Sequence, residues 1–299
     1  MHAIWHTVAT SAQRLSTARP AYAATALALY VVSLFIAGTR WRGFLGALGA
    51  KVTIARATAA TLGGIAAGNL TPSPGGEACR IALLRAGGRA TWAQATAAAV
   101  WDRLSELPPI LVLSAMALVA ARSLASGWRT NTMVIGIAVA LAIAGLVLWR
   151  LRRSGAAWIG WQAPKADDRV SARVFAQGVG YSSLLWLQDY LRLTCATLAF
   201  GVVLPPTQVA TLSVLAMLGG LVPSVAGLGP VEGGLMAGLL AFGVDLPTAA
   251  AITALERVIS YAFSTAAGAV VIAVLGGDSL WSTVRGRYAP DKDTDPARS

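Results

Sequence analysis

The sequence is poor in charge, histidine and cysteine. Only 12% of its 299 residues are charged, against roughly 25% in soluble proteins, while 56% are hydrophobic and the mean hydropathy is +0.63. Both histidines, His2 and His6, lie at the start of the chain, and the two cysteines, Cys79 and Cys195, have no metal-ligand or disulfide spacing. These absences argue against a histidine-based mechanism and a metal centre. We expect a polytopic membrane protein with no metal and no cofactor.

The sequence also shows no separate soluble domain. Its longest polar stretches, residues 150–172 and 276–299, are too short to form a core of their own. The net charge of +11 is typical of a membrane protein with arginine-rich cytoplasmic loops. We therefore expect no nucleic-acid partner.

A polar, helix-breaking segment runs from Asn69 to Glu77, with the sequence NLTPSPGGE, inside an otherwise apolar region. Two prolines and two glycines within five residues cannot continue a helix. A second break, VPSVAGLGPVE, runs from Val222 to Glu232. Broken backbone at membrane depth is tolerated only beside protein or a water-filled cavity, and paired breaks in two halves of a chain indicate a transporter-type site.

The two halves of the sequence repeat their motifs at nearly constant spacing. Pro72 and Ser73 recur as Pro223 and Ser224, 151 positions later. Glu77 recurs as Glu232, 155 positions later, and the pair Asp102-Arg103 recurs as Glu256-Arg257, 154 positions later. Such offsets indicate an internal duplication.

The fold class predicted from these features is an all-α polytopic membrane protein with two inverted repeats, each containing a broken re-entrant helical hairpin. The expected segments are an N-terminal interfacial segment at 1–20, membrane repeat 1 at 21–149, a basic cytoplasmic loop at 150–172, membrane repeat 2 at 173–275 and a polar C-terminal tail at 276–299. Cations concentrate on one side of this topology. The positive-inside rule therefore predicts a multi-pass protein of the cytoplasmic (inner) membrane with a cytoplasmic C-terminus.

Several charges lie inside or beside apolar helices, where an arginine costs at least ~2.5 kcal/mol unless it is paired or solvated. Arg103 and Arg257 suit a phosphate, because a guanidinium presents a planar fork of donors. Glu77 and Glu232 are expected to pair with these arginines when the site is empty. A purely structural interpretation stays open, in which the carboxylates cap their helices and the charged pairs lock the repeats together.

Other charged residues have simpler interpretations. Arg40, Trp41 and Arg42 are expected to close the first span as interfacial anchors, and Arg80 is either another anchor or a ligand. Asp189 and Arg192, three residues apart, are expected to pair with each other. The complete set of predicted substrate-binding residues is Asn69, Thr71, Ser73, Gly75, Gly76, Glu77, Arg80, Asp102, Arg103, Ser224, Gly227, Gly229, Glu232, Glu256, Arg257 and Tyr261. No catalytic residue is predicted.

With these motifs in this order, the chain resembles the flippase-like membrane region of the lysylphosphatidylglycerol synthases and its stand-alone relatives. The resembling elements are Arg40-Trp41-Arg42 with Leu45, Asn69 through Arg80, Asp102-Arg103, Pro223 through Glu232, and Glu256-Arg257 with Tyr261. The resemblance implies two inverted repeats with re-entrant hairpins, and the movement of aminoacylated phospholipids or polyprenyl-linked lipids across a membrane. The synthases' soluble aminoacyl-transferase domain has no counterpart here, so we expect a stand-alone member that does not make the lipid.

The predicted function is therefore that of a lipid flippase or translocator for a phosphate-containing lipid, with no enzymatic activity. Its expected partner is a membrane lipid with an anionic headgroup. Two further partners are compatible with the sequence: a separate lipid-modifying enzyme, and a second copy of the chain. Three alternative functions remain: a secondary transporter of a small anionic solute, a membrane-embedded enzyme that acts on lipid through carboxylates alone, and a non-catalytic membrane partner of a lipid-modifying enzyme.

Overall fold

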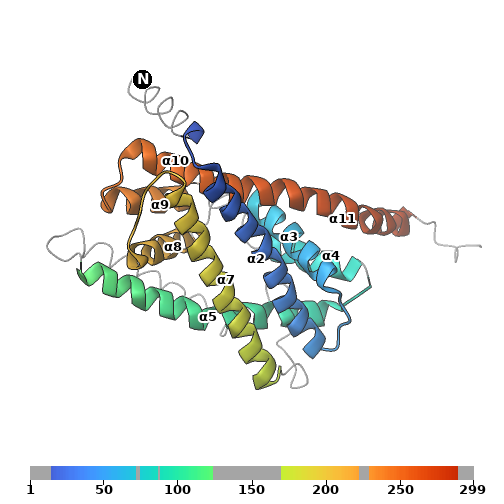
Figure 1. Ribbon diagram of the computed structural model, residues 1–299. Helices are drawn as coiled ribbons and strands as arrows, with labels where there is room; N and C mark the ends of the chain where they lie inside the picture. The colour runs from blue at the N-terminus through green and yellow to red at the C-terminus, as the bar shows by residue number, and fades with distance from the viewer. Residues whose placement is uncertain (1–14, 72–74, 87, 124–169, 222–228, 289–299) are drawn as a thin grey trace, which may run out of the picture.

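The computed structural model describes residues 15–71, 75–86, 88–123, 170–221 and 229–288 (Figure 1). Over these residues the chain is helical and contains no strand, which confirms the predicted all-α fold. The helices are α2 (Pro20–Ala47), α3 (Ile54–Leu70), α4 (Gly75–Ala86), α5 (Trp92–Ser123), α7 (Ala172–Leu198), α8 (Pro206–Leu221), α9 (Pro230–Ala241), α10 (Leu246–Arg257), the π-helix η3 (Val258–Phe263) and α11 (Ser264–Tyr288). The predicted site residues Ser73, Ser224 and Gly227 lie outside the described residues, as does most of the predicted 150–172 loop.

Local sequence signals set the helix boundaries. The side chains of Thr53, Ser171 and Asp245 accept hydrogen bonds from the first turns of α3, α7 and α10, as N-cap residues do. Gly49 follows α2 with φ = 82°, and Gly201, 152 positions later, follows α7 with φ = 76°. Left-handed backbone of this kind favours glycine and stops a helix.

Among the residues that the structure describes, two apolar stretches are long enough to cross a membrane. Pro20–Ala47 has a mean hydropathy of 1.9, and the continuous helix Leu246–Gly276 has a mean hydropathy of 2.1. By contrast, α4 and α9 have 12 residues each. At 1.5 Å per residue, such a helix is about 18 Å long, well short of a ~30 Å hydrocarbon core.

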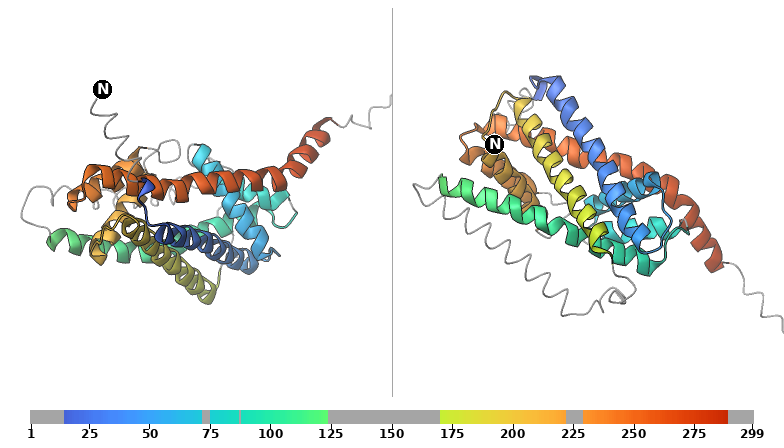
Figure 2. Two further views of the ribbon diagram at one scale, coloured as in Figure 1. Left: turned by 45° about the horizontal axis from the view of Figure 1, so that its top comes forward. Right: turned by 60° about the horizontal axis from the view of Figure 1, so that its bottom comes forward.

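Helices α2 and α7 pack side by side in the middle of the molecule and run antiparallel (Figures 1 and 2). Their contacts show that they are antiparallel: the later residue Arg40 of α2 contacts the earlier residue Ser182 of α7, and the earlier residue Tyr30 of α2 contacts the later residue Arg192 of α7. Gly178 of α7 lies against the ring of Phe44, where an added Cβ would come within 3.0 Å of Cε2. This close approach holds the two helices together.

Two antiparallel helix pairs flank this central pair, α3 with α4 on one side and α8 with α9 on the other (Figure 1). Glycines allow the backbones to approach. An added Cβ on Gly76 would lie 2.7 Å from the carbonyl oxygen of Gly64, and one on Gly219 would lie 2.6 Å from that of Pro230. The two breaks found in the sequence therefore separate the two arms of each helix pair.

Each of the long helices α5 and α11 packs against the flanking helix pair of the other half of the chain. The first part of α5 contacts α4, while its later part packs on α8 through Leu113 and Val214. In the same way α11 continues from α10 and packs along α3, where Gly268 lies against the backbone of Leu62. Each half of the chain thus contributes one long helix to the hairpin of the other half.

The buried apolar residues form two main cores, one in each half. The first gathers around Trp41, Phe44 and Leu84, and the second around Leu212, Leu235 and Ile252. Between and beside these cores lie two groups of ionised side chains.

Candidate functional site

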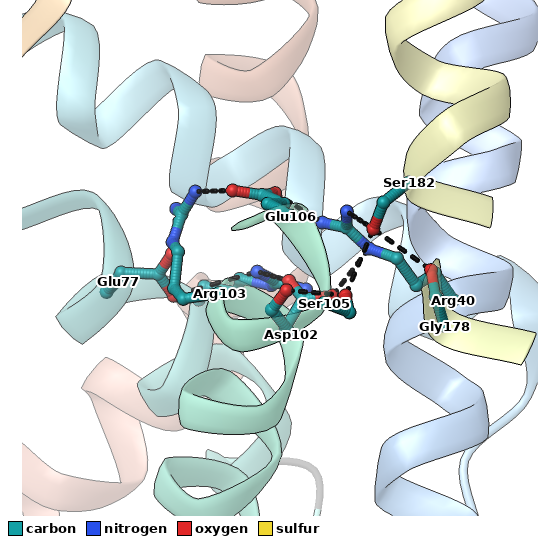
Figure 3. Close-up of polar contacts among 9 residues, drawn as sticks. Arg40, Glu77, Asp102, Arg103, Ser105, Glu106, Gly178 and Ser182 are labelled. Atoms are coloured by element: carbon teal, nitrogen blue, oxygen red, sulfur yellow. Dashed lines mark hydrogen bonds and ion pairs between the residues drawn. The ribbon is translucent and has the colours of Figure 1, made fainter. Parts of the chain in front are cut away.

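Six ionised side chains in the first half form a closed ring of alternating charge, hereafter the charged ring (Figure 3). In order around the ring they are Arg40, Asp102, Arg80, Glu77, Arg103 and Glu106. Arg40 comes from α2, Glu77 and Arg80 from α4, and the other three from α5. Three arginines and three carboxylates give the ring no net charge.

The inner half of the ring is buried. Asp102 has no exposed surface and lies between two arginines, at 2.7 Å from Arg40 Nε and 2.9 Å from Arg80 Nη1. Arg40 also reaches Glu106 at 2.7 Å and donates a hydrogen bond of 2.8 Å to the Ser182 hydroxyl on α7. The Arg80 guanidinium lies over the ring of Trp41, 3.6 Å from its centroid. This half of the ring joins α2, α4, α5 and α7.

The outer half of the ring is accessible. The Arg103 side chain is 60% exposed, while those of Glu77 and Glu106 are 30% and 23% exposed. Arg103 pairs with Glu77 and, at 3.1 Å, with Glu106. An arginine side chain that is this exposed can exchange a carboxylate for another oxyanion without unfolding the inner half.

The second half of the chain holds related pairs. Arg257 Nε lies 2.6 Å from Glu232, as Arg103 pairs with Glu77. Arg192 pairs with both Asp189 and Glu256, so the predicted Asp189–Arg192 pair is confirmed. Glu232 also accepts a hydrogen bond of 2.7 Å from the backbone N–H of Gly229, at the start of α9. These groups come from α7, α9 and α10.

The structure brings nine of the predicted site residues into these networks or their immediate surroundings. Glu77, Arg80, Asp102 and Arg103 belong to the charged ring; Glu232, Glu256, Arg257 and Gly229 belong to the second group; and Tyr261 lies 5.8 Å from the Arg257 guanidinium. The adjacent residues Asp102 and Arg103 bond to different partners, and so do Glu256 and Arg257.

Other predicted site residues have structural contacts. The Asn69 amide donates hydrogen bonds of 3.1 and 2.9 Å to Ser264 and Thr265 on α11, and Tyr261 donates one of 3.3 Å to the Asn69 carbonyl. The exposed Thr71 hydroxyl donates back to its own helix, at Ala67. Gly75 begins α4, and Gly76 packs against α3. These contacts fasten the end of α3.

Five residues of these networks were not among the predicted site residues, namely Arg40, Glu106, Ser182, Asp189 and Arg192. The prediction that Arg40 and Trp41 are interfacial anchors is wrong, because both are buried and α2 continues beyond them to Ala47. Arg80 is likewise buried rather than interfacial. A signal was available: Arg192 lies 152 positions after Arg40, within the range of offsets that relates the other motifs.

Comparison with known proteins identifies the family. The pattern of the lysylphosphatidylglycerol synthase TM region matches residues 3–268, nearly the whole chain. The chain belongs to this family. A relative called a UPF0104 membrane protein, from Methanothermobacter thermautotrophicus, is 26% identical over 296 residues, covering 88% of each chain. Another of that name, from Pyrococcus horikoshii, is 21% identical over 286 residues, covering 83% of this chain and 85% of the relative.

Membership of the family supports the sequence-based identification as a stand-alone membrane region and gives the chain a membrane context. The two apolar stretches that can span a bilayer agree with it. In such a context, both groups of charges belong to helices in which most side chains are apolar. Intramembrane ionised residues are costly, so they mark functional sites or obligatory pairs.

Proposed function

We propose that the protein is a lipid translocator of the cytoplasmic membrane, which moves a phosphate-containing lipid between leaflets. The lipid is an aminoacylated phospholipid or a polyprenyl-linked lipid. The exposure of Arg103 is the observation that carries this proposal, because its side chain is 60% exposed although it lies on a largely apolar helix. The family's name connects it with a phospholipid, and a phosphate is the oxyanion that an arginine fork binds well.

In this proposal the phosphate replaces a carboxylate on Arg103, and the Arg257–Glu232 pair offers a second position for it. Acyl chains stay in the bilayer throughout, which keeps their apolar surface out of water. The inner half of the charged ring, with Asp102 and Arg40 buried, holds the helices while the outer half exchanges ligands. No covalent step on the lipid is involved.

We also propose the inverted-repeat arrangement as the framework of transport. Three observations support it: α2 and α7 are antiparallel, α4 and α9 are each too short to span a bilayer, and corresponding contacts recur at offsets of 151–155 positions. The helix pairs α3–α4 and α8–α9 are then re-entrant hairpins that enter from opposite sides. Rocking of one repeat against the other would expose the site alternately to each leaflet.

A transport assay in proteoliposomes tests the proposal. A fluorescent aminoacylated phosphatidylglycerol is placed in both leaflets, and its movement is followed by quenching from outside. Arg103→Gln and Arg257→Gln should abolish movement while the folded state persists, because each removes a phosphate ligand without removing a buried partner of Asp102. Arg89→Gln, at an exposed arginine in the turn between α4 and α5, is the matched control and should transport normally.

Other outcomes separate the alternatives. Retained lipid movement in both arginine variants contradicts the proposed phosphate site. Uptake of inorganic phosphate or glycerol phosphate without lipid movement would indicate a transporter of small anions. A chemically altered lipid, detected by mass spectrometry, would indicate an enzyme. Transport that requires an added lipid-modifying enzyme would indicate that the chain acts as its membrane partner.

A further inference from the structure

The charged ring has a balance of charge that a bound phosphate would disturb. Three arginines face three carboxylates, so the empty ring is neutral. If Arg103 turns to a phosphodiester with one negative charge, on a lipid that carries no ammonium of its own, the ring and the lipid together carry an excess of one negative charge. At membrane depth, an uncompensated charge is costly. One positive charge must therefore enter with the phosphate.

The two carboxylates that Arg103 would release are not equivalent. Glu106 keeps its close partner, because its Oε1 lies 2.7 Å from Arg40 Nη2. Glu77 keeps only a distant one, since its Oε2 lies 3.6 Å from Arg80 Nη1. That buried oxygen has no hydrogen-bond partner among the described residues. Glu77 is thus the carboxylate that would lose its close positively charged partner.

The other ionisable groups around Glu77 cannot supply the missing charge. Arg80 already pairs with Asp102 at 2.9 Å, and Arg40 already pairs with both Asp102 and Glu106. On the neighbouring α3, the single ionisable residue, Arg56, donates to the Leu83 carbonyl. The part of α11 from Ser264 to Gly276 has no ionisable residue, and neither has α8, which packs on α5.

We propose that binding of a phosphodiester lipid at Arg103 takes up one proton, which Glu77 holds. This inference rests on the proposed function. The proton comes from water and adds to the Glu77 carboxylate, giving a neutral carboxylic acid, while Arg103 stays charged and pairs with the phosphate. Glu77 is 30% exposed, so water reaches it. The ring with its lipid is then neutral again, and lipid movement is coupled to a proton.

The corresponding residue in the second half is built differently. Both carboxylates lie in the first turn of a short helix, but Glu232 also accepts a backbone hydrogen bond of 2.7 Å from Gly229. Released from Arg257, Glu232 still has this donor. Proton uptake is therefore expected at Glu77 and not at Glu232.

Calorimetry on the purified full chain tests this directly. The protein in phosphatidylcholine nanodiscs is titrated with short-chain phosphatidylglycerol, whose phosphodiester keeps one charge, in two buffers that differ in protonation enthalpy. The difference in heat between the buffers counts the protons taken up per bound lipid. The wild type should take up one proton. Its affinity should fall about tenfold per unit of rising pH, because binding is linked to that proton.

Three variants complete the experiment. Glu77→Gln should bind with no proton uptake and no dependence on pH. Glu232→Gln lies outside the charged ring, leaves its charge balance unchanged and should still take up one proton. Arg103→Gln should lose binding.

Each remaining result has a distinct meaning. Wild-type binding that requires Arg103 but takes up no proton overturns this inference and leaves the proposed function standing; this measurement needs no variant of Glu77. Proton uptake that persists in Glu77→Gln also overturns it, because another group then carries the proton. No binding, or equal binding by Arg103→Gln, contradicts the proposed function itself.

Discussion

Arg40 and Arg192 reach across the same pair of helices in opposite directions. Arg40 on α2 donates to Ser182 on α7, while Arg192 on α7 lies 5.7 Å from the ring of Tyr30 on α2. Arg192 follows Arg40 by 152 positions, and Ser182 follows Tyr30 by the same number. Each arginine also pairs with the carboxylate at the equivalent place in its own half, Asp102 or Glu256. The same pair of positions is thus in contact twice, once through a hydrogen bond and once through a cation–π contact, with the two helices exchanging roles.

The first prediction concerns Arg40 and the fold. Arg40→Gln leaves the fully buried Asp102 paired with one arginine instead of two, and it removes the ion pair between Arg40 and Glu106. Breaking a buried ion pair by removing one member costs about 3–5 kcal/mol. We expect this loss in the free energy of unfolding, measured by SDS titration from mixed micelles.

Arg42→Gln is the control for Arg40. Arg42 is two positions away, exposed, and donates one hydrogen bond of 3.0 Å to the Val52 carbonyl. Its loss should cost about 1 kcal/mol. Equal effects of the two variants would show that the inner half of the charged ring does not stabilise the fold.

The second prediction concerns the contact between α2 and α7. Gly178→Ala places a methyl group against the Phe44 ring, within 3.0 Å of Cε2, so the ring or a helix must shift. Overpacking of this kind costs about 1–3 kcal/mol. The matched control lies on the same helix: an added Cβ at Gly180 meets no atom within 4 Å. Gly180→Ala should stabilise the helix by about 0.5–1 kcal/mol. Similar thermal stability of both variants would contradict the antiparallel α2–α7 packing.

The membrane class and the main helices could be predicted from the sequence because they depend on local features. Apolar composition identified the membrane protein, and prolines and glycines marked the two breaks between α3 and α4 and between α8 and α9. Within the site, the pairing of Asp189 with Arg192 followed from their spacing on one helix. Glu77 with Arg103, and Glu232 with Arg257, followed from the repeated motifs.

The closed ring could not be predicted in the same way, because its closure depends on contacts between helices. Arg40 stands beside Trp41 and Arg42 in a pattern typical of an interfacial helix end, and only the packing of α5 and α7 against α2 shows that it is buried. Glu106 lies near Pro108 and Pro109 and carries no motif of its own. Its role follows from the position of Arg40, 66 residues away in the sequence.

The third prediction concerns Asn69, whose amide joins the end of α3 to the start of α11 through Ser264 and Thr265. Asn69→Ala removes both hydrogen bonds, and interhelical hydrogen bonds in membranes contribute about 0.6 kcal/mol each on average. We therefore expect a loss of about 1 kcal/mol in stability. Thr71→Val, at an exposed residue whose hydroxyl donates to Ala67 of its own helix, is the control and should change stability by less than half as much. An unchanged stability of Asn69→Ala would show that this amide is free for another partner.

The fourth prediction concerns the sidedness of the two halves. Lys51 lies in the turn after α2, and Val203, 79% exposed, lies in the turn after α7. Because α2 and α7 are antiparallel, the proposed inverted repeats place these turns on opposite sides of the membrane. In a background with Cys79→Ser and Cys195→Ser, we expect a membrane-impermeant maleimide to label Val203→Cys in intact cells. Lys51→Cys should be labelled only after permeabilisation, since its side carries the cations that face the cytoplasm. Labelling of both cysteines from the same side would contradict the inverted repeats, while a reversed pattern would keep the repeats and invert the proposed orientation.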